Sequence, residues 1–478
     1  MQIVRNAGIC DTSGEYETEV MVCDEKLQHS ATFKEENCMA QDKPTSDFRY
    51  DTGEARVPWA AVGEHLANED LMRIVRFLMK PEVGKDAEYE ARAASVEAAL
   101  AQLWEVSGPA TKLSLGDTVS KLEAEAKEFL GCEYACFLTN ATAGFEVALK
   151  YANIGPGDEV IVPAITFIAT MMYTLQSGAK VVFADVDPNT INMDPADVAR
   201  KVTDKTKAII PVYIGGYPPD MDAIMKIAEE RDIVVLADAA HAFGGIYKGK
   251  AAGTVAHFGA YSFHEVKNIN ALGEGGLLVT DLDFGQYFPQ CRFLGVDLSK
   301  QIKNWLYDVI AVPGKYGPFV AGNHSSTEIQ ALCLLGQMER LQAVIDTRRA
   351  NAEYLNERFS EVEGIITPPL DTDEIKSTHH LYLLRMDHEL IGQDVQVFKQ
   401  KMEARGVVQI PHFAPLYKFQ LCRDLGYDTD AIAETCPNTE MVFNHQFTHL
   451  PLYPLTQEQR EYMADAVIDS VEEMKAGK

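Results

Sequence analysis

The chain has 478 residues, 46% hydrophobic and 24% charged, which allows two domains with large cores and is typical of a soluble globular protein. Its 71 acidic residues outnumber 43 Lys and Arg residues, and the formal charge of −28 disfavours nucleic acid and anionic membranes as partners. No apolar stretch is long enough to cross a bilayer, and the N-terminal sequence lacks the pattern of a secretory signal. We therefore expect a cytoplasmic protein whose nine cysteines, an odd number without a C-x-x-C pair, are free thiols.

The N-terminal part is predicted to be an arm followed by helices. Residues 1–55 are polar, with little periodicity, and predict an arm that is flexible or lies along a partner. Helical spacing begins at residue 65, and further helices are predicted at 88–106 and 117–131. The first pattern places four apolar residues on one face: Leu71, Ile74, Val75 and Leu78.

Short apolar runs then alternate with helical patterns. Seven runs predict buried strands, at 135–138, 159–163, 180–184, 208–212, 233–237, 259–263 and 277–280. The alternation predicts an α/β fold with a mostly parallel seven-stranded sheet flanked by helices, in which ligands bind beyond the carboxyl ends of the strands. After about residue 345 the pattern changes. We therefore predict a large domain with its N-terminal helices at 56–345 and a small C-terminal α+β domain at 346–478.

A carboxylate follows the predicted strand 233–237. Taken alone, Asp238 could simply cap the helix after it. The alternative is that it pairs with the pyridinium nitrogen of a bound cofactor and keeps that ring protonated, the state in which the ring accepts electrons. A charge-assisted hydrogen bond of roughly 1.5–3 kcal/mol would fix this protonation state.

The next predicted strand leads to a lysine. Lys267 lies between Ser262, near the strand end, and a glycine-rich run at 273–276 that leaves room for a bulky ligand. Most lysines are simply solvated. A lysine that forms an imine needs its pKa lowered from about 10.4 to roughly 7–8, which burial and a nearby cation achieve.

The run SFHEVKNINALGEGGLLVTD resembles the Schiff-base segment of DegT/StrS-type sugar aminotransferases, which belong to fold type I of the pyridoxal 5'-phosphate (PLP) enzymes. The similarity extends from about Val57 to the C-terminus and is interrupted by extra residues near 80–105. It implies that Lys267 binds PLP covalently and that Asp238 pairs with its pyridinium nitrogen. It also implies that His241 bonds the ring hydroxyl.

Three further segments fit this resemblance. The turn at 139–144 opens a predicted helix, and although it could be a plain N-cap turn, its N–H groups and the helix dipole suit a phosphate. The resemblance implies that Thr142, Ala143 and Ser262 hold the cofactor phosphate and that Phe167 stacks on the ring. It also implies that Asn323 contacts the phosphate bound to a neighbouring protomer, so that a homodimer shares its active sites.

The resemblance implies an aminotransferase that moves an amino group from glutamate or glutamine to a keto sugar, nucleotide-linked in many family members, or to a keto cyclitol. Residues 436–440 weakly resemble cyclitol aminotransferases and aminohydroxybenzoate synthases. The alternatives are a PLP-dependent dehydration like that of the aminohydroxybenzoate synthases, another PLP reaction, or a non-catalytic PLP-binding regulator. No metal site is expected, because the pair His379 and His380 has no further ligand at a recognisable spacing.

Overall fold

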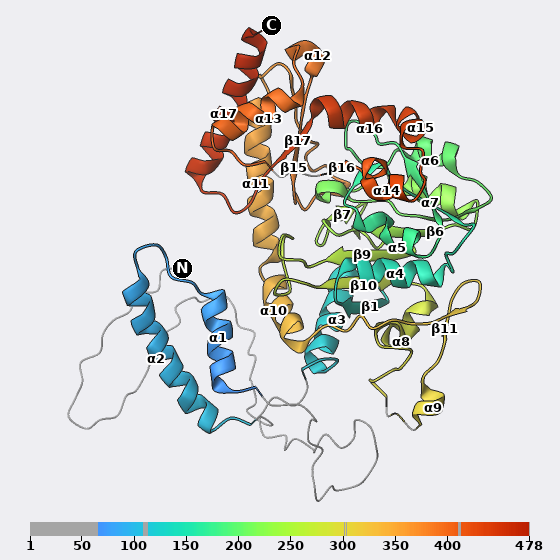
Figure 1. The fold of residues 1–478 in the computed structure, drawn as a ribbon, viewed down its shortest axis with the longest axis vertical. Coiled ribbons are helices and arrows are strands. Elements are labelled where there is room, and N and C mark those ends of the chain that lie inside the picture. The colour runs from blue at the N-terminus through green and yellow to red at the C-terminus, as the bar shows by residue number, and fades with distance from the viewer. Residues whose placement is uncertain (1–65, 109–112, 301, 303, 410–412, 478) are drawn as a thin grey trace, which may run out of the picture.

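The computed structural model of this chain describes residues 66–108, 113–300, 302, 304–409 and 413–477, and the predicted arm at 1–55 lies outside them. A seven-stranded sheet forms its centre, with the strand order β1-β10-β9-β6-β5-β2-β4 (Figure 1). Only β10 runs against its two neighbours, β1 and β9, while the remaining neighbours pair in parallel. The expected mostly parallel, seven-stranded sheet is confirmed. Its strands are β1 (Tyr134–Leu138), β2 (Glu159–Pro163), β4 (Lys180–Ala184), β5 (Thr206–Ile209), β6 (Val234–Asp238), β9 (Phe258–Ser262) and β10 (Gly276–Thr280).

The position of β5 differs from the prediction at 208–212. The strand ends at Ile209, two residues before Pro211, which has no N–H to donate to a neighbouring strand. Val212 keeps only an isolated parallel bridge to Asp238. The apolar run is therefore buried, as expected, but its second half lies beyond the strand.

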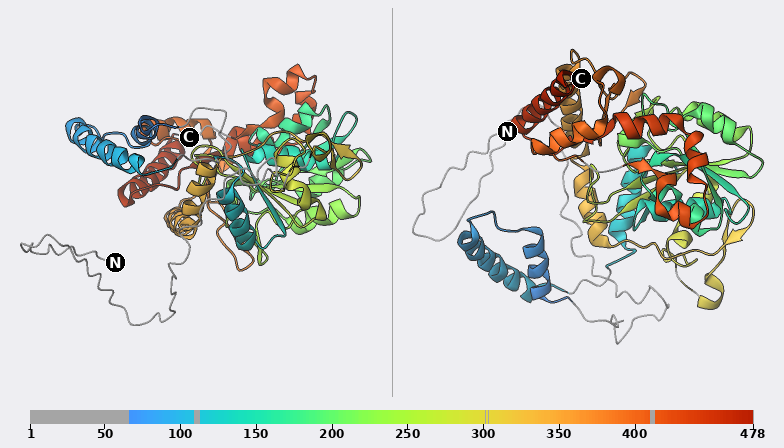
Figure 2. Two further views of the ribbon diagram at one scale, coloured as in Figure 1. Left: turned by 90° about the horizontal axis from the view of Figure 1, so that it is seen from below. Right: turned by 45° about the horizontal axis from the view of Figure 1, so that its top comes forward.

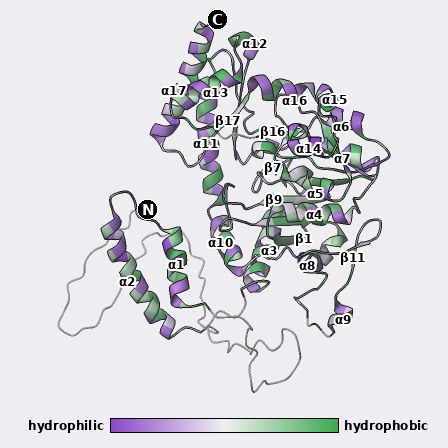
Figure 3. Ribbon diagram, viewed as in Figure 1, coloured by the Kyte–Doolittle hydropathy of each residue, from purple (hydrophilic) through white to green (hydrophobic). Residues whose placement is uncertain are grey.

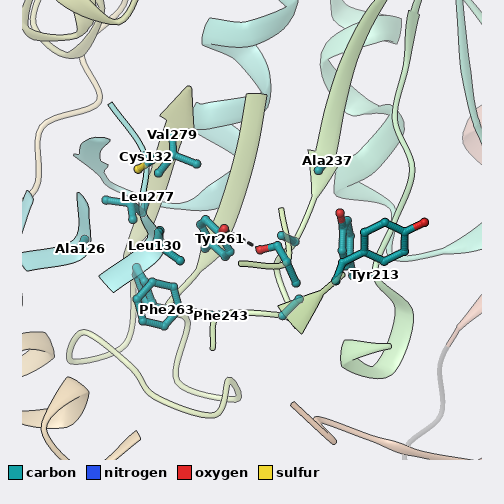
Figure 4. Close-up of a cluster of buried hydrophobic side chains, with 14 of the residues drawn as sticks. Ala126, Leu130, Cys132, Tyr213, Ala237, Phe243, Tyr261, Phe263, Leu277 and Val279 are labelled. Carbon is teal, nitrogen blue, oxygen red and sulfur yellow. Dashed lines mark hydrogen bonds between the residues drawn. The ribbon is translucent and has the colours of Figure 1, made fainter. Parts of the chain in front are cut away.

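Helices cover both faces of the sheet, and as a result every residue of β2, β6 and β10 is buried. One face packs against the cluster in Figure 4, where the ring of Phe243 lies 5.3 Å from that of Tyr261 and 5.0 Å from that of Phe263. Gly131 ends α3 in a left-handed conformation with φ 66°. The helices and small strands of this part are α3 (Asp117–Leu130), β3 (Ile165–Thr166), α4 (Ala141–Tyr151), α5 (Ala169–Gln176), α6 (Pro195–Lys201), α7 (Met221–Glu229), β7 (Ile246–Tyr247), β8 (Lys250–Ala251), α8 (Phe288–Arg292), α9 (Trp305–Asp308), β11 (Val312–Pro313), β12 (Pro318–Phe319) and α10 (Glu328–Met338).

The long helix α11 (Leu341–Phe359) leads into a smaller α+β region at one end of the sheet (Figure 1). This region has a three-stranded sheet in the order β13-β15-β17. The expected boundary at 345/346 falls inside α11 and stays a prediction. The chain also returns to the large part, because β16 pairs with β3 and Tyr417, Cys422 and Cys436 are buried with the residues of the large sheet. The elements are β13 (Ile365–Ile366), β14 (Ile375–Lys376), β15 (Tyr382–Met386), α12 (His388–Ile391), α13 (Val395–Ala404), β16 (Ala414–Pro415), α14 (Gln420–Asp424), α15 (Thr429–Glu434), α16 (Pro437–Met441), η5 (Val442–Gln446), β17 (Phe447–Leu450) and α17 (Gln457–Ala476).

The helices α1 (Asn68–Leu78) and α2 (Asp86–Glu105) form a hairpin that stands apart from the sheet (Figures 1 and 2). Arg76 pairs with Glu90 at 3.0 Å and joins the two helices. Hydrophobic positions occur along both helices (Figure 3), and Ile74 and Leu78 of the predicted apolar face are exposed. Among the described residues, no helix combines the length and apolarity that crossing a membrane requires.

Candidate active site

Asp238 and Lys267 come from neighbouring strands at the carboxyl edge of the sheet. Asp238 is the last residue of β6, and Lys267 lies five residues after the end of β9. β6 and β9 pair in parallel, with Asp238 opposite Ala260. Because parallel strands end at the same edge, both residues lie at the edge where ligands bind in sheets of this kind. Each acts on the pKa of the other.

The carboxylate of Asp238 is buried and held by two donors. The hydroxyl of Thr170 donates to one oxygen at 2.8 Å, and the backbone N–H of Ala240 donates to the other at 3.2 Å. Burial raises the pKa of Asp238, and these hydrogen bonds together with the charge of Lys267 oppose that rise. A protonated ring nitrogen on this carboxylate would offset the cost of burying its charge.

The amine of Lys267 is half-buried, and its backbone N–H donates to the carbonyl of His264 at 2.9 Å. Burial lowers the pKa of Lys267 to about 8, although the charge of Asp238 works in the opposite direction. A much larger fraction of this amine is therefore neutral near pH 7 than in a solvated lysine. The neutral amine is the form that attacks a carbonyl and accepts a proton.

Two imidazole rings, tilted by 30° to each other, lie close to the lysine. The ring centroids of His241 and His380 are 4.4 Å apart. Asn268, next to Lys267, has its side-chain oxygen within hydrogen-bond distance of Nδ1 of His380, at 2.8 Å. Burial, followed by the charges of His241 and Lys267, lowers the pKa of His380 well below its usual value. His380 is therefore neutral, and it adds no positive charge beside His241 or the lysine.

The residues predicted to hold the phosphate lie at the start of α4 and at the end of β9, beside the start of β10. Asn140 caps α4 by accepting from the backbone N–H of Ala143 at 3.0 Å. Thr142 precedes Ala143 in this first turn, where N–H groups have no acceptor within the helix. Ser262 lies opposite Gly276 in the β9–β10 register. A Cβ on Gly276 would lie under 3.0 Å from the carbonyl carbon of Asn140, so only glycine lets β10 approach the helix start this closely.

Phe167 and Asn323 lie at the surface. Phe167 connects β3 to α5 and is 54% exposed although Ile165 and Thr166 before it are buried, so its side chain can meet a ligand from solvent. Asn323 is exposed, and its side-chain oxygen accepts from the backbone N–H of Ser325 at 3.2 Å. The carbonyl of the neighbouring His324 accepts from the backbone N–H of Thr139 at 3.0 Å, which brings this segment beside the α4 cradle of its own chain. The expected contact of Asn323 with a neighbouring protomer stays a prediction.

Sequence reasoning missed Thr170, Asn268 and the position of His380. Thr170 reaches Asp238 across 68 residues and His380 reaches Asn268 across 112, and no local pattern marks either contact. Sequence analysis considered His380 only as a metal ligand and left its partners open. Among the described residues, no group of three or more His, Cys, Asp or Glu side chains is placed to hold a metal ion.

Comparison with known protein families identifies the family of this chain. The DegT/DnrJ/EryC1/StrS aminotransferase family model matches residues 95–471. The chain belongs to this family. Of the extra residues near 80–105, those before 95 precede the match, and the segment forms the loop before α2 and the whole of that helix.

Relatives and solved structures of this family agree with the assignment. GDP-perosamine synthase of Caulobacter vibrioides is 31% identical, over 68% of this chain and 83% of that protein. 3-Amino-5-hydroxybenzoate synthase of Amycolatopsis mediterranei is also 31% identical, over 74% and 90% respectively. The pyridoxamine-phosphate form of Spr1654 from Streptococcus pneumoniae, described as a candidate sugar aminotransferase, superposes with a TM-score of 0.67 at 26% identity, over 76% of this chain and 94% of that one.

As a DegT/DnrJ/EryC1/StrS family member, the chain is a PLP-dependent aminotransferase of fold type I. Three features of the residues at the sheet edge fit this cofactor: an amine with a lowered pKa at Lys267, a buried carboxylate at Asp238, and the start of α4, where N–H groups suit an anion. The chemical properties of these residues therefore agree with the family assignment that the sequence similarity gives.

Proposed function

We propose that this aminotransferase moves an amino group from glutamate or glutamine to the keto group of a nucleotide-linked sugar or of a cyclitol. The observation that carries the proposal is the placement of Asp238 and Lys267 at one edge of the sheet, where burial has lowered the pKa of the amine to about 8. The similarity to GDP-perosamine synthase and to 3-amino-5-hydroxybenzoate synthase supports an acceptor that carries a ring with hydroxyl groups.

In this proposal, Lys267, Asp238 and His241 bind PLP through its aldehyde carbon, its ring nitrogen and its ring hydroxyl. Thr142, Ala143 and Ser262 hold the phosphate, and Phe167 covers one face of the ring. PLP, when bound, supplies the electron sink that stabilises negative charge at the Cα atom of the donor. Asp238 keeps the ring nitrogen protonated, and Thr170 and Ala240 fix the direction of its carboxylate.

Lys267 is proposed to carry the proton. Its neutral Nζ would take the proton from the donor Cα, and the resulting ammonium would deliver it to the former aldehyde carbon of PLP. In the second half-reaction the two carbon atoms would exchange roles, so that Lys267 carries a proton from the cofactor carbon to the carbon of the former keto group. A pKa of about 8 suits this task because both forms are accessible near neutral pH. The neutral His380 keeps a second positive charge away from this amine.

The test of the proposal is a pair of half-reactions with the PLP-loaded protein. Glutamate or glutamine should convert the cofactor to its amino form with release of the keto acid, measured by absorbance and by mass spectrometry. Keto-sugar nucleotides and keto cyclitols should then restore the starting spectrum. A cofactor spectrum that stays unchanged with every amino donor would contradict aminotransfer.

The similarity to 3-amino-5-hydroxybenzoate synthase favours a second candidate, a dehydration that uses the same residues. The two reactions differ in their product, because dehydration removes water from a cyclic substrate while amino transfer exchanges oxygen for an amino group. Mass spectrometry of the product formed from a keto cyclitol distinguishes them.

We also propose that the protein is a cytoplasmic homodimer with shared active sites. The support is the resemblance to the family, which implies that Asn323 contacts the phosphate of a neighbouring protomer, together with the exposure of Asn323. Two copies that exchange the segment around Asn323 could each complete the site of the other. Apart from the second protomer, its proposed partners are the small-molecule amino donor and keto acceptor.

A further inference from the structure

The turn between β14 and β15 contacts the candidate site at two points. The hydroxyl of Thr378 donates to the backbone carbonyl of His241. The side-chain amide of Asn268 donates to the carbonyl of Thr378 at 3.0 Å, and its oxygen lies 2.8 Å from Nδ1 of His380. Because Asn268 directly follows Lys267 in the chain, the turn holds the segment that carries the lysine.

His379 lies inside this turn in a backbone conformation that L-amino acids rarely adopt. Its φ angle is 47°, in the left-handed region, and its side chain is buried. Rotation about this angle sets the direction of the Thr378 carbonyl relative to His380, and these are the two groups that Asn268 contacts. An extended backbone at His379 would turn one of them away. Strained backbone persists only where the surrounding structure holds it, and it gathers at functional sites.

Asp371 binds the turn on both sides of the strained angle. Nε2 of His379 lies 3.0 Å from one carboxylate oxygen, and the same oxygen accepts from the backbone N–H of Ser377 at 2.9 Å. Nε of Arg349 donates to the other oxygen at 2.8 Å. Burial raises the pKa of Asp371, but these hydrogen bonds and the nearby positive charges lower it to about 2. The carboxylate is therefore ionised near neutral pH and accepts all three hydrogen bonds.

We propose that Asp371 is a positioning residue for the amino-transfer reaction, and that it acts by holding His379 in the left-handed conformation. The turn in this conformation keeps its contacts with Asn268, and Asn268 keeps the segment of Lys267 in place. Asp371 acts without touching the donor or the cofactor. This inference rests on the proposed function, in which Lys267 carries the proton, and it gives a role to a carboxylate that the mechanism has not used.

The test is a double-mutant cycle on the PLP-loaded protein. The readout is the rate of the half-reaction at saturating donor, with glutamate or glutamine. Asp371→Asn should slow this half-reaction about 10-fold or more, because small displacements of reacting groups cost large factors in rate. Glycine adopts the left-handed conformation without strain, so in a His379→Gly background the same Asp371→Asn change should slow it less than about twofold.

Asp346→Asn provides the control for the lost carboxylate. Asp346 also accepts from Arg349, at 2.7 Å, but it lies in α11 and its side chain is 55% exposed. The substitution takes a carboxylate from the same arginine outside the turn, and this variant should react at the wild-type rate.

The pH midpoint of PLP uptake by the apoprotein is a second readout, which a loss of packing elsewhere in the molecule would not change. It should rise in Asp371→Asn, because a displaced Lys267 is less buried and its pKa then moves from about 8 towards that of a solvated lysine. An Asp371→Asn protein that reacts slowly but keeps the wild-type midpoint would show that Asp371 only supports the fold.

Three results for the rate would also overturn the proposal: a wild-type rate in Asp371→Asn, equal slowing by this change with and without His379→Gly, or equal effects of Asp371→Asn and Asp346→Asn. A wild-type protein that shows no half-reaction with any amino donor would instead contradict the proposed function. In that case the pH midpoints of PLP uptake still decide whether Asp371 positions Lys267.

Discussion

At the scale of single residues, the site depends on the balance between burial and charge at Lys267. Burial lowers the pKa of its amine to about 8, and Asp238 raises it. We predict that the apoprotein takes up PLP at a rate that rises with pH, with a midpoint near pH 8 and a plateau above it, because the neutral amine is the reactive form. In Asp238→Asn the midpoint should move to lower pH, since the charge that stabilises the ammonium is gone.

The measurement is the amount of cofactor trapped on the protein by borohydride as a function of time and pH. A solvated lysine derivative, with a pKa of about 10.4, provides the reference series. A protein midpoint close to that of the reference would contradict the assignment of Lys267, as would trapping that persists in Lys267→Ala.

Thr170 is predicted to act through Asp238. Removing its hydroxyl in Thr170→Val takes one hydrogen bond from a buried carboxylate, a loss worth roughly 1.5–3 kcal/mol, and lets burial raise the pKa of Asp238 further. The half-reaction with glutamate should therefore slow about 10-fold or more, with a matching loss of thermal stability. Its pH profile should also move, because ring protonation weakens as Asp238 becomes harder to ionise.

Thr174→Val is the matched control for that variant. Thr174 lies one turn later in α5, is fully buried, and its hydroxyl has no hydrogen-bond partner among the described residues. The substitution should leave both the rate and the pH profile unchanged. Equal effects of the two substitutions would show that Thr170 only fills space.

The sequence singles out Lys267 and Asp238 as candidates because each follows a strand that apolar spacing makes visible, and because a specific motif surrounds the lysine. Thr170, Asn268 and His380 have no such signal. Their roles depend on which elements the fold brings together, and a threonine in a first helical turn or a histidine before a strand is ordinary in sequence. Which residues position Asp238 and Lys267 therefore depends on contacts between distant parts of the chain, and local sequence does not show them.

At the scale of elements, the close approach of β10 to the start of α4 is the feature most sensitive to change. In Gly276→Ala the new Cβ would clash with the carbonyl carbon of Asn140 and with the amide nitrogen of Ala141, both under 3.0 Å away, so the helix start must move. We predict destabilisation of about 1–3 kcal/mol and weaker retention of PLP, because the moved N–H groups belong to the proposed phosphate cradle.

Thermal unfolding and cofactor dissociation measure these two effects. Gly336→Ala provides the control, since Gly336 lies inside α10 and a Cβ there would meet no atom within 4 Å, so this variant should be stabilised by roughly 0.5–1 kcal/mol. Retention of PLP by Gly276→Ala at the wild-type level would contradict a cradle at the start of α4.

Apolar periodicity predicted all seven strands of the large sheet, because buried parallel strands are short runs of hydrophobic residues. Apolar periodicity could not predict strands that pair over only two residues. β3 and β16 contribute two residues each, too few for any pattern, yet their pairing returns the C-terminal part of the chain to the large sheet. The prediction of a separate domain at 346–478 could not include this return, since it depends on a contact between residues about 250 positions apart.

At the scale of the whole molecule, the exposed apolar side chains of the α1–α2 hairpin contrast with the covered sheet. Phe77 is 74% exposed and Trp104 37%, and the hairpin stands apart from the rest of the chain (Figure 2). The formal charge of −28 makes two copies of the chain repel each other and opposes non-specific association through these side chains. The sequence pattern predicts the two helices and shows which of their side chains share an apolar face. It does not show which other surface that face contacts.

Shared active sites are the property that only the assembled molecule can show. Lys267→Ala removes the reacting amine, and Asn323→Asp places a negative charge where a phosphate contact is proposed, so each variant alone should lose most activity. If Asn323 acts on the neighbouring protomer, unfolding and refolding the two variants together should form mixed dimers in which one site lacks both changes, and part of the activity should return. If Asn323 acts within its own chain, beside Thr139 and the start of α4, every mixed dimer has one defect in each site. Activity would then stay at the level of the separate variants, and the shared site would be ruled out.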